Sequence, residues 1–168
     1  MFQTTTFKDF REVITDDENM LIFEKNVSVP MGDRFPVRCN VFRPLAPNGA
    51  KFPVLVTYGP YGKDIPYSES VLYSLKQLIF TNWSLSFLES SFNEINPDHR
   101  SKYSAWETPE PTYWTKAGYV IVRADERGSG QSPGLLNLGS ADTSKCFAKL
   151  IEWAAVQPWS SGKIGLLG

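Results

Sequence analysis

The fold class can be predicted from two stretches, Ile151-Glu152-Trp153-Ala154-Ala155-Val156-Gln157-Pro158-Trp159 and Lys163-Ile164-Gly165-Leu166-Leu167-Gly168. The first part belongs to an amphipathic helix expected over residues 143–157, with Asp142 placed to cap its start and Pro158 preventing its continuation. Its apolar residues recur at helical spacing: Phe147, Leu150, Ile151, Ala154 and Ala155. The second part is typical of a short buried strand that ends on a glycine. A helix that leads into a buried strand indicates an α/β fold.

Two other continuous apolar runs have the pattern of strands that are covered on both faces. They are Phe52 to Tyr58 and Tyr119 to Val122. Upstream, residues 21–30 and 37–44 are extended, and apolar and polar side chains alternate in the second of them, as in a half-exposed hairpin. The sequence therefore predicts one α/β domain with a mostly parallel sheet and an antiparallel amino-terminal hairpin.

Composition limits the function classes. The chain has 168 residues, of which 42% are hydrophobic, enough for one globular domain. A formal net charge of −1 provides no basic field, so neither nucleic acid nor an anionic membrane is an expected partner. Cys39 and Cys146 are far apart and lack metal-ligand spacing, so we expect buried free thiols and predict neither a metal site nor a cofactor. Residues 1–9 lack the pattern of a signal or anchor, which predicts a cytoplasmic protein.

The segment Tyr58-Gly59-Pro60-Tyr61-Gly62-Lys63 directly follows the first buried strand. In α/β-hydrolases the loop after this strand supplies part of the oxyanion hole, whose hydrogen-bond donors stabilise the charge that develops on a substrate carbonyl oxygen. The phenol of Tyr61 is the candidate donor. The residues alone leave open the alternative of a surface turn with a packed aromatic side chain.

The segment Ala124 to Gly134 follows the next buried strand, and we expect it to be scaffold, with Asp125 and Arg127 paired. Within it, Gly130-Gln131-Ser132-Pro133-Gly134 matches the nucleophile motif G-x-S-x-G. That motif needs a backbone N–H after the serine, and Pro133 has none, so Ser132 is excluded as the nucleophile. His99 is the single histidine and lies in a polar stretch, where no catalytic role is expected.

These motifs together resemble the Xaa-Pro dipeptidyl-peptidase and cocaine-esterase-like (CocE/NonD) serine hydrolases, from about Val27 onward. The resemblance implies an enzyme that cleaves small-molecule esters, amides or Xaa-Pro peptides through an acyl-enzyme, and Tyr61 matches the oxyanion tyrosine of the family. Gly168 matches the first glycine of the nucleophile elbow, and in this fold the acid and the histidine follow the serine. Residues 1–168 are therefore expected to be the amino-terminal part of one α/β-hydrolase domain, without the triad and inactive alone.

Residues 71–90 depart from the family pattern and form an atypical insertion, with large apolar residues and no clean period. A lineage-specific helix, an added lid and a retained short intron all remain open. Two other functions remain open as well: a non-catalytic binding remnant, and one half of a complementing pair. The strand that ends near Gly168 would leave an open sheet edge, so self-association is expected.

Overall fold

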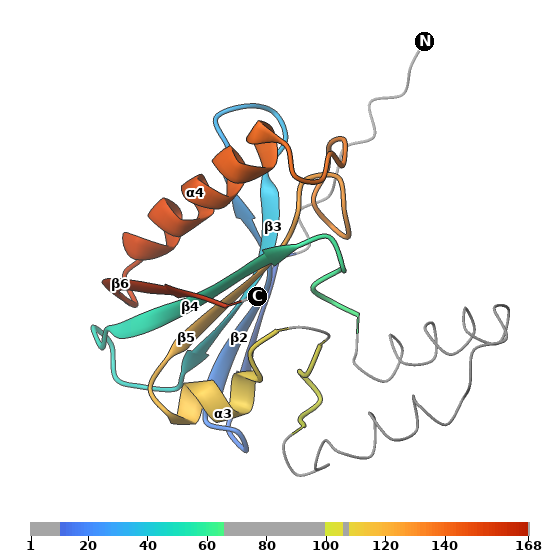
Figure 1. Ribbon diagram of the computed structural model, residues 1–168. Coiled ribbons are helices and arrows are strands. Elements are labelled where there is room, and N and C mark those ends of the chain that lie inside the picture. The colour runs from blue at the N-terminus through green and yellow to red at the C-terminus, as the bar shows by residue number, and fades with distance from the viewer. Residues whose placement is uncertain (1–10, 66–99, 106–107, 168) are drawn as a thin grey trace, which may run out of the picture.

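The computed structural model describes residues 11–65, 100–105 and 108–167, which form one six-stranded sheet with helices on both faces (Figure 1). The atypical residues 71–90 and His99 lie outside the described residues. The strand order is β1-β2-β3-β5-β4-β6. The strands are β1 (Glu12–Asp16), β2 (Leu21–Val29), β3 (Val37–Pro44), β4 (Phe52–Gly59), β5 (Val120–Asp125) and β6 (Ser160–Leu166), and the helices are α3 (Pro111–Lys116) and α4 (Ala141–Ala155).

The α/β fold is confirmed, and the sheet is mixed. Strand β4 pairs in parallel with both β5 and β6. The pairs β1–β2, β2–β3 and β3–β5 are antiparallel. The sheet has more antiparallel strand pairs than the sequence predicts. The reason is that β1 extends the predicted hairpin by one strand and that β3 pairs with β5 in the antiparallel sense.

The core is divided between the two faces of the sheet. Helix α4 covers one face and α3 the other (Figure 1). Under α4, the strand residues Val54, Val56 and Val122 pack with Leu150 and Ala154, all fully buried. The opposite face holds a second cluster: Leu21, Phe23, Phe42 and Ile121, with Trp114 of α3 against it. Because β5 is covered on both faces, all its residues are buried, which explains its continuous apolar run.

Helix α4 begins two residues earlier than expected, and its cap is a different residue. The N-cap is Ser140, whose hydroxyl accepts a hydrogen bond from the Thr143 backbone N–H at 3.2 Å. Asp142, predicted as the cap, lies instead in the first turn, where its carboxylate is 3.2 Å from the Arg127 guanidinium. The helix ends at Ala155, two residues before the expected end at Gln157, and Pro158 lies beyond it as the sequence predicts. Cys39 and Cys146 are both buried and free, also as predicted.

The connections between the parallel strands determine where a site can form. The chain passes one face of the sheet by α3 between β4 and β5, and the other face by α4 between β5 and β6 (Figure 1). The carboxyl ends of β4, β5 and β6 therefore meet at one edge of the sheet, which is where ligands bind in open α/β sheets. No helix of the described residues is long and apolar enough to cross a membrane.

Candidate active site

A pocket of about 250 Å³ lies at the carboxyl edge of the parallel strands. Its walls come from the end of β4 with the loop that follows, from β5 and from the residue after β6. The lining residues are 57–63, Thr108, Arg123, Ala124 and Leu167. The backbone N–H of Glu126 donates to the Gly59 carbonyl at 2.8 Å, which joins the loop after β4 to the loop after β5.

Asp125 holds these two loops in place. Its side-chain carboxylate accepts hydrogen bonds from the backbone N–H groups of Lys63, in the first loop, and Gln131, in the second. The Lys63 ammonium is 3.9 Å away, and Asp125 is 1% exposed. Burial raises the pKa of this carboxyl group, and the two N–H bonds and Lys63 partly offset the effect. A side chain at Gly130 would lie 2.3 Å from the carboxylate, so only glycine fits there.

The expected pair of Asp125 with Arg127 is wrong. Arg127 instead reaches Asp33, at 2.9 Å, and Asp142, at 3.2 Å. The reason is geometric, because both oxygens of Asp125 accept from backbone N–H groups, while the Arg127 guanidinium lies beside Asp33 and Asp142. Arg127 therefore ties the loop after β5 to the hairpin loop before β3 and to the first turn of α4.

Ser132 has a structural position, in agreement with its exclusion as the nucleophile. Its hydroxyl accepts from the Arg38 backbone N–H and donates to the Asp125 carbonyl, each at 2.8 Å, and the residue is 4% exposed. The hydroxyl thus fastens the loop after β5 to β3. The described residues contain no histidine, so they include no Ser–His pair.

Two tyrosines, Tyr58 near the end of β4 and Tyr61 in the loop after it, have different environments. Tyr58 stacks on Phe147 with a centroid distance of 5.3 Å, and its hydroxyl accepts from the Arg127 backbone N–H at 3.3 Å. Burial raises the pKa of Tyr58 to about 12. Tyr61 lines the pocket, is 59% exposed, and has no hydrogen-bond partner among the described residues. Its phenol is therefore available to a ligand, and its oxyanion role stays a prediction.

Thr57 and Arg123 form a polar part of the pocket wall that the sequence analysis missed. They are paired in register across β4 and β5 and are 6% and 3% exposed. Thr57 Oγ1 and Arg123 Nε have no hydrogen-bond partner among the described residues. Arg123 also donates to the carbonyl of Tyr103 at 2.9 Å, and burial lowers its pKa to about 10, so it stays charged at neutral pH. Arg123 could have been predicted, because it is a charged residue that directly follows the apolar run of β5. No sequence pattern distinguishes Thr57.

The loops after β4 and β5, together with β6, lie inside the segment that matches a known family. The family model of the X-Pro dipeptidyl-peptidases (S15 family) matches residues 32–168. The chain belongs to this family. The resemblance read from Tyr58 to Lys63 and from Ala124 to Gly134 is thereby confirmed, for the amino-terminal part of the family fold.

Solved structures agree with the family. Two crystal structures of a CocE/NonD family hydrolase from Staphylococcus aureus share 31% identity with this chain, with TM-scores of 0.67 and 0.66 over 88% of it. An alpha-amino acid ester hydrolase has the same fold, with a TM-score of 0.54 at 17% identity over all of the chain. The chain spans only 23% of the length of the Staphylococcus structures and 24% of the ester hydrolase. No curated protein matches the chain.

Proposed function

We propose that this chain forms the amino-terminal part of the catalytic domain of a serine hydrolase. The complete enzyme cleaves an ester or amide bond of a small molecule or peptide, Xaa-Pro bonds included, through an acyl-enzyme. The observation that carries this proposal is the position of Tyr61, which lines a pocket at the shared carboxyl edge of three parallel strands. Membership of the S15 family supports it.

The reaction requires a hydrogen-bond donor at this edge of the sheet. A serine hydroxyl attacks the substrate carbonyl carbon, and the carbonyl oxygen becomes negatively charged in the tetrahedral intermediate. Tyr61 donates a hydrogen bond to that oxygen, which is the kind of interaction that lowers the barrier most. The intermediate then expels the protonated leaving group, and water hydrolyses the acyl-enzyme. Asp125 acts through Lys63 N–H and Gln131 N–H, by holding the loop that carries Tyr61.

The attacking serine and its base are proposed to come from outside the described residues. Ser132 already uses its hydroxyl in two bonds, and the described residues contain no histidine. In the family pattern, the elbow that presents the nucleophile begins at Gly168, directly after β6. Residues 1–168 alone are therefore proposed to lack acyl-transfer activity.

A fluorophosphonate probe tests this assignment, because it labels only serines that are activated as nucleophiles. We expect no labelling of residues 1–168, and we expect labelling and hydrolysis of p-nitrophenyl esters by a protein whose transcript continues past codon 168 into Gly-x-Ser-x-Gly. Labelling of the 168-residue chain that disappears in Ser132→Ala would contradict the proposal. An extended protein that contains the motif and remains unlabelled would contradict it as well.

A second candidate function is binding through the sheet edge at β6. This strand is the last in the strand order, and Leu166 and Leu167 are 57% and 40% exposed. An edge strand with exposed leucines is a template for pairing with another strand, either from a second copy or from a complementing polypeptide.

The 168-residue chain is therefore expected to self-associate with rising concentration, measured by sedimentation velocity. Leu166→Lys should shift the distribution toward monomer, because a charge on an edge strand opposes pairing. Leu135→Lys is the matched control, since Leu135 is 83% exposed in the loop after β5 and not on the edge. A chain that stays monomeric at every concentration would contradict this candidate.

A further inference from the structure

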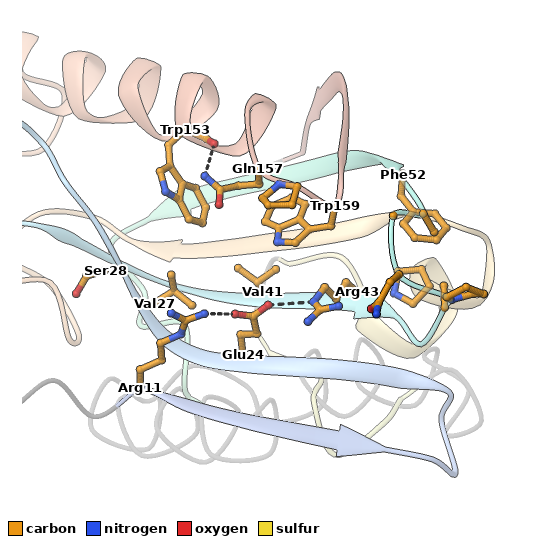
Figure 2. A pocket seen from close by; sticks show the side chains of 17 residues that line it. Arg11, Glu24, Val27, Ser28, Val41, Arg43, Phe52, Trp153, Gln157 and Trp159 are labelled. Carbon is orange, nitrogen blue, oxygen red and sulfur yellow. Dashed lines mark hydrogen bonds and ion pairs between the residues drawn. The ribbon is translucent and has the colours of Figure 1, made fainter.

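A second pocket, of about 510 Å³, lies at the other end of the parallel strands. It is lined by the start of β4, the loop between β3 and β4, the face of β2 and β3, and the chain from the end of α4 to Trp159 (Figure 2). The eight residues of β4 separate it from the Tyr61 loop, roughly 23 Å along the strand at 3.3 Å per residue. The proposed hydrolase reaction uses none of its residues.

One wall of this pocket is aromatic. The indoles of Trp153 and Trp159 meet edge to face, with centroids 6.1 Å apart and planes at 73°. Their backbones are held in place, because Trp159 C=O accepts from the Phe52 N–H at 2.9 Å and Trp153 C=O accepts from the Gln157 side chain at 2.9 Å. Both indoles remain only partly buried although they pack against the core. This wall offers rigid ring surface to a ligand.

The facing wall is ionic. Glu24 lies between Arg11 and Arg43, with oxygen to nitrogen distances of 2.6 and 3.0 Å (Figure 2). The Glu24 side chain is 9% exposed, and the three groups carry a net charge of +1. Each guanidinium makes one hydrogen bond to Glu24 and none to other described residues, so most of its five N–H donors stay free. The Arg43 side chain is 29% exposed and Arg11 is 55% exposed, so both can reach a ligand.

We propose that this pocket binds a planar aromatic anion, specifically an aromatic carboxylate. The ring of such a ligand stacks against Trp153 and Trp159, and its carboxylate accepts from the free N–H groups of Arg43 and Arg11. The fixed Glu24 repels a second negative charge, which favours a monoanion. The volume falls within the range of small-molecule sites, which combine aromatic walls with a few placed polar groups.

Isothermal titration calorimetry on the 168-residue protein tests the proposal with 2-naphthoate and its neutral isostere 2-naphthamide. Naphthoate is expected to bind about tenfold more tightly, because only the carboxylate gains charge-assisted hydrogen bonds. Arg43→Gln should reduce this preference several-fold, with Arg11 supplying the remainder, while leaving the naphthamide affinity unchanged. The matched control is Arg34→Gln, which removes an exposed arginine that does not line the pocket and should change neither affinity.

The NMR resonances of the Trp153 and Trp159 indole N–H groups show where the ligand binds. We expect both resonances to shift when the unmutated protein is titrated with naphthoate. Equal affinity for naphthoate and naphthamide would overturn the proposal in favour of a merely hydrophobic groove. Absence of binding by both ligands would overturn it as well, and so would shifts confined to other tryptophans. None of these results depends on whether the hydrolase assignment is correct.

Discussion

Asp125→Asn is expected to lower the free energy of unfolding by about 3 kcal/mol, because it leaves a buried donor without an acceptor. The carboxylate accepts from Lys63 N–H and from Gln131 N–H, one on each oxygen. An amide of the same size keeps one oxygen and turns an NH₂ group toward the other N–H. The Lys63 ammonium, whose side chain is 0% exposed, also loses the carboxylate 3.9 Å away.

Part of this loss is recovered, because burial raises the pKa of Asp125 and an uncharged side chain avoids that cost of desolvation. The hydrogen-bond term still dominates, since both donors are backbone N–H groups and the bond from Lys63 N–H is buried. Urea denaturation followed by circular dichroism measures the difference. Asp17→Asn, in the exposed turn between β1 and β2, is the matched control and should change stability by less than about 0.5 kcal/mol. An Asp125→Asn protein as stable as this control would show that Asp125 does not hold the two loops.

Tyr61→Phe in the complete enzyme is expected to lower kcat for ester hydrolysis roughly 100-fold, since one oxyanion donor is typically worth that much. KM should change little, because the phenol gains its bond only when the carbonyl oxygen becomes charged. Stability should be unaffected, because Tyr61 is 59% exposed and its hydroxyl has no partner among the described residues.

Tyr113→Phe provides the control for the Tyr61 experiment. Tyr113 lies on α3, is 65% exposed and does not line the pocket, so it matches Tyr61 in exposure but not in place. Stopped-flow and steady-state measurements on a p-nitrophenyl ester separate acylation from turnover. If the Tyr61→Phe enzyme keeps full kcat, Tyr61 is not an oxyanion-hole donor. The alternative, a surface turn with a packed aromatic side chain, would then be correct.

Most of the strands and helix α4 could be predicted because their signals are local. The runs around Val54 and Val120 show burial on both faces within a few residues, and the spacing of Leu150 and Ala154 shows one buried helix face. The family could also be inferred, since its motifs lie at three short stretches of chain. Strand β1 was missed because its exposed residues carry no clear alternation.

What the sequence determined by itself is the α/β class, the family, and the place of Tyr61 in the loop after β4, since periodicity and motif order are properties of neighbouring residues. Which groups meet across the chain depends on the tertiary structure. Asp125 binds Lys63 N–H, 62 residues away, and not the nearby Arg127. Arg43 and Glu24 face Trp159 across a pocket built from four separate segments. Such partners are selected by strand order and by the need to pair each buried polar group, and neither leaves a pattern in the local sequence.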